Sequence, residues 1–159
     1  NTYLQDRILE NSKDPIGDAR IHAMSFYRTP ESLNQRFLRS KNIEKGIYNV
    51  ESWLDHHAIK LSQRFSLNSY KFLNKLLRSA DITRDDSILE SKILRSKSEI
   101  HIISVDSDIF FLPDEDRMTT QRLKKQEVKI KNHVIESIHG HDAFLIENEQ
   151  IKNILRTIF

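Results

Sequence analysis

A carboxylate and a histidine follow two apolar stretches in the C-terminal third of the chain. The first stretch ends in Val105-Asp106-Ser107-Asp108, and the second in His139-Gly140-His141-Asp142. In a catalytic triad, an acid holds an imidazole in one tautomer, and the imidazole takes a proton from a nucleophile. We therefore interpret Asp108 and His141 as an orienting acid and a general base. By spacing alone, Asp106 could equally be the acid, and an Asx turn beside a solvated histidine is the plainer alternative.

A triad that ends in an acid and then a histidine needs a nucleophile earlier in the chain, and this sequence supplies none. The α/β-hydrolases, which share that order, place a serine in a Gly-x-Ser-x-Gly turn. The glycines at positions 17, 46 and 140 cannot form that turn, and there is no cysteine to act as a thiol nucleophile. Three interpretations are open: a piece of a longer enzyme, a chain whose other half is a separate polypeptide, and a degenerate remnant. We favour the first, expect the nucleophile upstream of this chain, and expect the chain by itself to be inactive.

Arg20 and Tyr27 are a second pair that could do chemistry. They are seven residues apart in a predicted helix, so they lie two turns apart on the same face. An arginine with a tyrosine hydroxyl beside it could bind a substrate carboxylate. The alternative is an ordinary amphipathic helix on which the arginine extends its charged end into solvent.

A histidine-based metal site is a further alternative. Four residues could supply its ligands: His133, His139, His141 and Asp142. Gly140 favours a turn over such a ligand set, and we predict no metal. In Asp55-His56-His57 the two histidines would point about 100° apart on a helix. We interpret them as surface or lid-packing residues.

The predicted elements divide the chain into a helical region, residues 1–95, and an α/β region, residues 96–159. Apolar residues at helical spacing, with start signals at Asp14-Pro15 and Thr29-Pro30, predict helices over 2–11, 15–28, 31–37 and 51–65, from 68 onward and over 89–94. A loop is predicted over 41–49. Strands are predicted over 99–105 and 133–138, and helices over 113–125 and from about 148.

Two parallel strands alone would leave unpaired edges and uncovered faces. We infer that residues 96–159 are the C-terminal part of a larger α/β sheet whose other strands lie upstream, and that residues 1–95 are a helical lid or insertion. The predicted fold class is α/β: a partial α/β-hydrolase fold, with a helical lid followed by the last two core strands and helices. A first residue Asn1, in place of an initiator Met, fits a chain that starts inside a longer protein.

The composition argues against several other functions. The formal charge is +2, from 25 basic and 23 acidic residues, and gives no electrostatic reason to bind nucleic acid or an anionic membrane. No apolar stretch reaches the roughly 18 residues of a membrane span, and the first residues are not a signal peptide. The lack of cysteine excludes a disulfide scaffold and is compatible with a reducing cytoplasm.

Several segments are similar, in order, to one known family. Residues 19–37, which include Ser25-Phe26-Tyr27-Arg28-Thr29-Pro30-Glu31, and then 50–54, 64–65 and 68–70 resemble its lid. Val105-Asp106-Ser107-Asp108-Ile109-Phe110-Phe111-Leu112-Pro113 resembles its acid loop, and Gly140-His141-Asp142-Ala143-Phe144-Leu145-Ile146-Glu147 its histidine loop. The family is the homoserine O-acetyltransferases, which are acyltransferases of the α/β-hydrolase fold. The matches span most of the 159 residues.

The resemblance implies a Ser-Asp-His triad in which Asp108, rather than Asp106, is the acid and His141 is the base. Acetyl-CoA would acylate the serine, and the hydroxyl of L-homoserine would then take the acetyl group. Acetyl-CoA is thus a co-substrate, and no bound cofactor is expected. The reaction belongs to methionine biosynthesis, so the resemblance implies a cytoplasmic enzyme.

The resemblance also implies that Arg20, Tyr27 and Asp142 bind the substrate. Arg20 would face the α-carboxylate of L-homoserine, and Asp142 its α-ammonium. The lid helices of the family form a homodimer contact, so a homodimer is expected. Three alternatives stay open: an acyltransferase with a succinyl donor or a serine acceptor, a related esterase, and a non-catalytic helical fragment.

Overall fold

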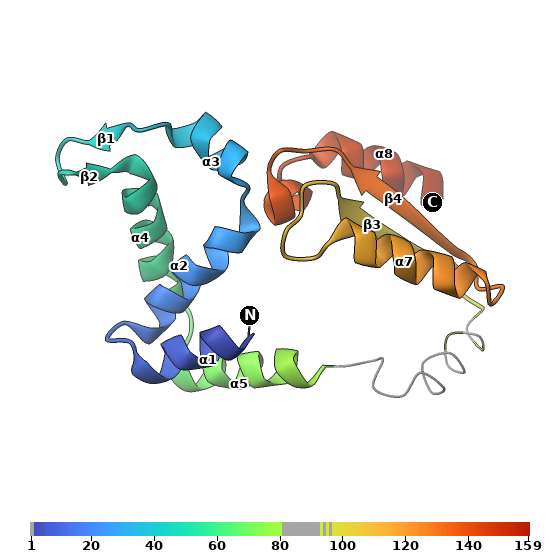
Figure 1. The fold of residues 1–159 in the computed structure, drawn as a ribbon, viewed down its shortest axis with the longest axis horizontal. Coiled ribbons are helices and arrows are strands. Elements are labelled where there is room, and N and C mark those ends of the chain that lie inside the picture. Colours follow the sequence, from blue (N-terminus) through green and yellow to red (C-terminus); the bar gives the residue numbers. More distant parts are fainter. Residues whose placement is uncertain (1, 81–92, 94, 96) are drawn as a thin grey trace. The chain divides into compact units, whose positions relative to one another are not determined.

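The computed structural model describes residues 2–80, 93, 95 and 97–159, which form two compact units (Figure 1). One unit contains residues 2–25 and 33–80. The other contains residues 26–32 together with the described residues from 93 onward. The predicted helix over 89–94 and the predicted boundary at 95 lie outside the described residues, apart from positions 93 and 95. None of the described helices is long and apolar enough to cross a membrane.

The first unit is built from helices that match the predicted segments to within a few residues. They are α1 (Thr2–Asn11), α2 (Pro15–Tyr27), α3 (Pro30–Phe37), α4 (Asn49–Ser62) and α5 (Leu67–Ser79). Side chains of α1 bind both neighbours: the Gln5 amide donates to the carbonyl of Ala19, and the Asn74 amide donates to Asp6. Leu9 and Ala19 are almost fully buried and form part of the apolar core.

The predicted loop over 41–49 contains a short hairpin that the sequence pattern does not predict. Strands β1 (Lys41–Asn42) and β2 (Ile47–Tyr48) pair in antiparallel register. Gly46, with φ of +68°, closes the turn and donates its N–H to the carbonyl of Asn42 at 2.9 Å. Because each strand has two residues, neither carries a periodic pattern long enough to predict.

The second unit contains two parallel strands and three helices. They are β3 (Ile100–Val105), α7 (Pro113–Lys124), β4 (Ile130–Ile135), the 3₁₀ helix η1 (Gly140–Leu145) and α8 (Asn148–Ile158). The register of β3 and β4 runs from Ile100 opposite Ile130 to Val105 opposite Ile135. The carboxyl ends of both strands therefore lie at the same edge, and the acid loop and the histidine loop leave the sheet side by side.

The prediction of β4 over residues 133–138 is wrong at both ends, since the strand covers Ile130–Ile135. Beyond Ile135 the backbone no longer pairs with β3. The N–H of Glu136 donates to the Gln150 side chain, and the N–H of Ser137 donates to the Asp106 carboxylate, at 3.0 and 2.9 Å. These side-chain acceptors end the strand and begin the histidine loop.

Helices cover both faces of the strand pair (Figure 1). On one face the Ser104 hydroxyl of β3 donates to Asp116 of α7 at 2.8 Å. On the other face Val105 and Ile135 pack with Ala143 of η1 and with two residues of α8, Ile151 and Ile154. Ile135 and Ala143 have no exposed surface. This core fixes the strand ends from which the two loops extend.

Candidate active site

Asp108 and His141 form a hydrogen-bonded pair between the two loops. The Asp108 Oδ2 atom lies 2.9 Å from His141 Nδ1. Asp108 is 6% exposed, and the His141 side chain is 21% exposed. Within the part of the chain that the structure describes, no group is hydrogen-bonded to His141 Nε2. An acid on Nδ1 leaves Nε2 as the nitrogen that can exchange a proton.

The acid loop holds Asp108 through the second carboxylate oxygen. Asp108 Oδ1 accepts the backbone N–H of Phe110 at 2.7 Å and that of Phe111 at 3.0 Å. This Asx-type turn follows directly from the position of an aspartate two and three residues before those amides. The Asx turn that the sequence offered as an alternative is therefore present at Asp108, but the same carboxylate also binds His141.

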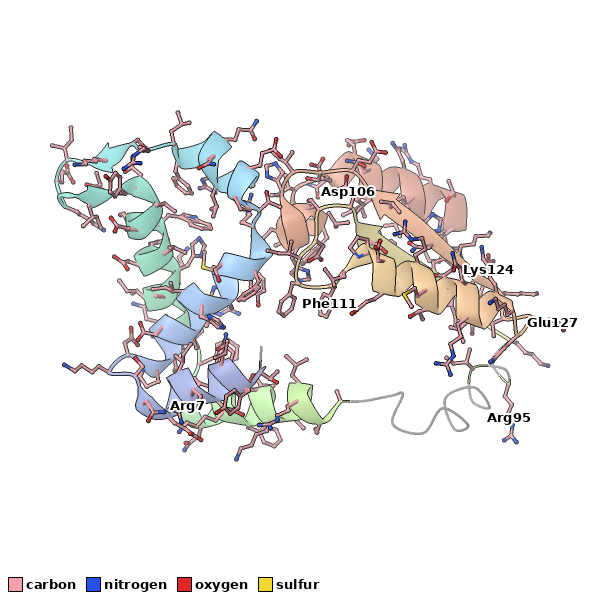
Figure 2. The ribbon with its side chains drawn as sticks, in the orientation of Figure 1. Arg7, Arg95, Asp106, Phe111, Lys124 and Glu127 are labelled. Carbon is pink, nitrogen blue, oxygen red and sulfur yellow. The ribbon has the colours of Figure 1, made fainter. Side chains whose placement is uncertain are left out.

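Asp106 has a different partner and a different environment. It lies exposed at the end of β3, while Phe111 lies further along the same loop (Figure 2). Its Oδ1 atom accepts the backbone N–H of Ser137 at 2.9 Å. The structure thus brings Asp108, and not Asp106, into contact with His141.

Ser107 links the two loops between these carboxylates. Its hydroxyl donates to the carbonyl of Ser137 and accepts the backbone N–H of Gly140, the latter at 3.0 Å. Gly140 has φ of +63°, a left-handed conformation that glycine adopts without a steric cost. The hydrogen bonds of Ser107 to Ser137 and Gly140 therefore hold the acid loop and the histidine loop at a fixed distance from each other.

Aromatic rings surround the His141 imidazole. The ring centroids of Tyr27, Phe110, Phe111 and Phe144 lie 5.2 to 5.5 Å from that of His141. A cavity of about 560 Å³ reaches the pair and is lined mainly by apolar side chains of β3, β4 and α8. Apolar walls around a proton-transfer group limit its access to water. The structure thus places the predicted site residue Tyr27 next to His141.

The predicted ammonium-binding residue, Asp142, is paired with an arginine. Asp142 Oδ2 accepts a hydrogen bond from Arg28 Nε at 2.9 Å, and the two side chains are 23% and 13% exposed. Arg28 follows directly after Tyr27, and it is absent from the predicted site residues. The sequence signal that could have identified it is its position inside the lid segment 19–37, immediately beside Tyr27.

Arg20 belongs to the other unit, where it lies on α2. There the pKa of His57 is lowered from 6.5, first by burial and next by the positive charge of Arg20. His57 packs on Trp53 with ring centroids 5.0 Å apart, which agrees with the lid-packing role expected for this histidine. The predicted role of Arg20 at a substrate carboxylate stays a prediction.

The remaining histidines bind separate partners. His133 Nε2 lies 2.9 Å from His101 Nδ1, and His139 Nδ1 lies 2.8 Å from the Ser32 hydroxyl. Among the residues that the structure describes, no three histidine, aspartate or glutamate side chains gather as a metal-binding group. The alternative ligand set of His133, His139, His141 and Asp142 is therefore not assembled.

Known proteins resemble this chain over most of its length. A homoserine O-acetyltransferase of Methanococcus vannielii is 33% identical over 145 residues, and one of Clavibacter michiganensis is 35% identical over 143 residues. Each alignment covers 86% of this chain, but 29% and 37% of the relative. No family model matches the chain. The chain thus spans roughly a third of the length of these relatives.

A solved structure extends this likeness to the fold. The crystal structure of homoserine O-acetyltransferase from Bacillus anthracis matches with a TM-score of 0.71 and 18% sequence identity. The match covers 89% of this chain and 41% of that chain. The predicted fold class is confirmed: the chain forms part of an α/β-hydrolase fold, and it resembles part of a homoserine O-acetyltransferase.

Proposed function

We propose that this chain supplies the acid, the general base and acceptor-binding groups of a homoserine O-acetyltransferase. The observation that carries the proposal is the 2.9 Å bond between His141 Nδ1 and the buried Asp108 carboxylate, at the carboxyl ends of two parallel strands. The names of the relatives supply the reaction. The serine that carries the acetyl group would lie in a part of the longer protein outside these 159 residues.

In the first half-reaction His141 Nε2 takes the proton of the serine hydroxyl as the serine oxygen attacks the thioester carbon of acetyl-CoA. The carbon–sulfur bond breaks, and the CoA sulfur leaves with the proton that the imidazolium returns. An acetyl ester remains on the serine. While the ring is charged it faces the Asp108 carboxylate, which stabilises the positive charge and keeps Nε2 directed away from itself.

In the second half-reaction the hydroxyl of L-homoserine takes the place of the leaving thiol. His141 Nε2 accepts the hydroxyl proton, the oxygen attacks the acetyl ester, and the proton returns to the serine oxygen as the ester bond breaks. Water would compete at this step. The aromatic rings of Tyr27, Phe110, Phe111 and Phe144 lie around the imidazole and are the groups that would restrict water there.

Arg20, Tyr27 and Asp142 are proposed to bind the amino-acid end of the acceptor. Arg20 binds the α-carboxylate and Asp142 the α-ammonium of L-homoserine, with the Tyr27 ring beside the histidine. These roles follow from the resemblance of residues 19–37 and 140–147 to the family. The 5.3 Å ring contact of Tyr27 with His141 supports a place for Tyr27 in the site.

The proposal includes a homodimer, formed through the helical region, in the cytoplasm. Helix α5 supports the dimer, because its large apolar side chains are 47–60% exposed: Phe72, Leu73, Leu76 and Leu77. Exposed apolar faces of this kind mark sites of protein association.

The test measures release of free CoA from acetyl-CoA by the whole protein that contains these residues, with L-homoserine as acceptor. We expect His141→Ala to abolish transfer, and His56→Ala, at an exposed position on α4, to leave it unchanged. L-serine, water and succinyl-CoA are compared in parallel. Full turnover in His141→Ala would contradict the triad, and equal rates with water or L-serine would favour an esterase or a serine acyltransferase.

A further inference from the structure

Arg28 lies at the centre of a polar network beside the histidine loop. Its Nε atom donates to Asp142 Oδ2 at 2.9 Å, and its Nη1 atom donates to the Ser32 hydroxyl at 3.1 Å and to His139 Nδ1 at 3.2 Å. The Ser32 hydroxyl also lies 2.8 Å from His139 Nδ1. The arginine side chain is only 13% exposed. One guanidinium thus contacts two residues of the loop and one residue of α3.

The guanidinium fixes the direction of every bond in this network because it can only donate. His139 Nδ1 must therefore be an acceptor, which places the proton of a neutral imidazole on Nε2. The Ser32 hydroxyl accepts from Arg28, and its own proton points to His139 Nδ1. Loss of the guanidinium would remove the group that determines both the tautomer of His139 and the orientation of the Ser32 hydroxyl.

Other contacts hold the histidine loop against the same segment. The Thr29 hydroxyl donates to the carbonyl of Ile138. At Gly140 an added Cβ would lie 3.2 Å from the Tyr27 carbonyl oxygen, so the two backbones approach closely. This explains why residues 26–32 group with the α/β unit rather than with the helices on either side of them, whereas the predicted division places them in the helical region.

Asp142 is oriented by this contact. Arg28 occupies Oδ2, and among the described residues no donor is bound to Oδ1. A carboxylate with one oxygen held by a guanidinium presents the other in a defined direction. His141 does not depend on Arg28 in the same way, because the Asp108 carboxylate binds its ring directly.

We propose that Arg28 is a positioning residue for the acceptor: it holds Asp142 Oδ2 so that Oδ1 faces the ammonium group of an amino-acid substrate. This inference rests on the proposed function, since it assumes that an amino acid is the acceptor. It predicts that Arg28 matters for acceptors that carry an ammonium group and hardly for acceptors that lack one.

The experiment compares Arg28→Gln, Arg28→Lys and wild type in the whole protein that contains this chain. The acceptors are L-homoserine and 4-hydroxybutanoate, which has the same hydroxyl and carboxylate but no ammonium group. For Arg28→Gln we expect kcat/KM with L-homoserine to fall roughly 10- to 100-fold, mostly through KM, as for the loss of one charge-assisted hydrogen bond. With 4-hydroxybutanoate we expect a change of less than about threefold, and Arg28→Lys should restore part of the loss.

Two controls separate positioning from general damage. Arg117→Gln removes another arginine–aspartate pair, the one with Asp114 at an exposed site on α7. It should leave kcat/KM unchanged with both acceptors. In the double variant Arg28→Gln with Asp142→Asn, the loss of kcat/KM with L-homoserine should be smaller than the two single losses combined, because Arg28 acts through Asp142. Additive losses would contradict the proposal.

The outcomes distinguish this inference from the proposed function. Equal losses with both acceptors would show that Arg28 has a general structural role, and would overturn the inference alone. A wild-type protein that transfers acetyl groups to neither acceptor would overturn the proposed function and the inference together. As a direct test of the network, the ¹⁵N resonances of His139 should show an unprotonated Nδ1 in the wild type and a mixture of forms in Arg28→Gln. A protonated Nδ1 in the wild type would also overturn the inference.

Discussion

Replacing Asp108 by asparagine should reverse the tautomer of His141. The two backbone N–H groups of Phe110 and Phe111 both donate to Asp108 Oδ1, so the single carbonyl oxygen of an asparagine must stay there. Its amide nitrogen then takes the place of Oδ2, 2.9 Å from His141 Nδ1. Because an amide nitrogen only donates, Nδ1 becomes an acceptor and the ring proton moves to Nε2. The nitrogen that should act as base is thereby blocked.

The expected loss of acetyl transfer is large. In serine proteases the corresponding change to the wrong tautomer lowers kcat about 10⁴-fold with the geometry intact. Each tenfold corresponds to about 1.4 kcal/mol, so the expected increase in activation free energy is roughly 5.5 kcal/mol. The assay is release of free CoA from acetyl-CoA in the presence of L-homoserine, with the whole protein that contains this chain. Because the asparagine keeps both backbone hydrogen bonds, we expect the unfolding midpoint to change little.

Asp106→Asn is the matched control. Asp106 is exposed and accepts a single N–H, from Ser137, which the asparagine oxygen can accept equally well. We expect its activity to stay within about twofold of wild type, as for most substitutions at exposed sites. A loss smaller than tenfold in Asp108→Asn, or similar losses in both variants, would refute the reasoning.

Further predictions concern stability and its pH dependence, measured by urea unfolding of the protein that contains the chain. Gly140→Ala should lower the free energy of unfolding by roughly 1–2 kcal/mol more than Gly46→Ala does. Both glycines have positive φ, but of the two only Gly140 has atoms within 3.2–3.3 Å of an added Cβ. Equal destabilisation by the two variants would contradict this crowding. Ile135→Ala, at a position with no exposed surface, should lose about 3 kcal/mol, and Val134→Ala, 53% exposed, less than about 1 kcal/mol. Burial and neighbouring positive charges lower the pKa of His57 from 6.5, so just below pH 6.5 the unfolded chain binds more protons than the folded chain. Stability should therefore rise with pH in that window and level off above it, and His57→Gln should flatten the rise; an unchanged slope would exclude His57 as its source.

Most helices and the strand β3 could be predicted from the sequence because their signals are local. Pro15 and Pro30 begin helices α2 and α3 as predicted, and α7 begins at Pro113. The shift of β4 to Ile130–Ile135 could not be predicted in this way. Its end depends on the bonds of the Glu136 and Ser137 amides to Gln150 and Asp106, which are distant in the sequence.

In the candidate site, too, contacts between residues distant in the sequence could not be predicted from local patterns. Asp106 and Asp108 follow the end of β3 by one and three residues, so the strand pattern does not choose between them, whereas in the structure only Asp108 binds His141. The pairing of Asp142 with Arg28 joins residues 114 positions apart and has no local pattern. The resemblance to a family implied the pairing of Asp108 with His141, whereas the network of Arg28 required the structure.

The most direct test of the central claim is the intact mass of the whole protein after incubation with acetyl-CoA without an acceptor. If Asp108 and His141 activate a serine for acyl transfer, the wild type gains the mass of one acetyl group and loses it on addition of L-homoserine, while His141→Ala gains none. A His141→Ala protein that acquires and discharges the acetyl group as fast as wild type would contradict the account.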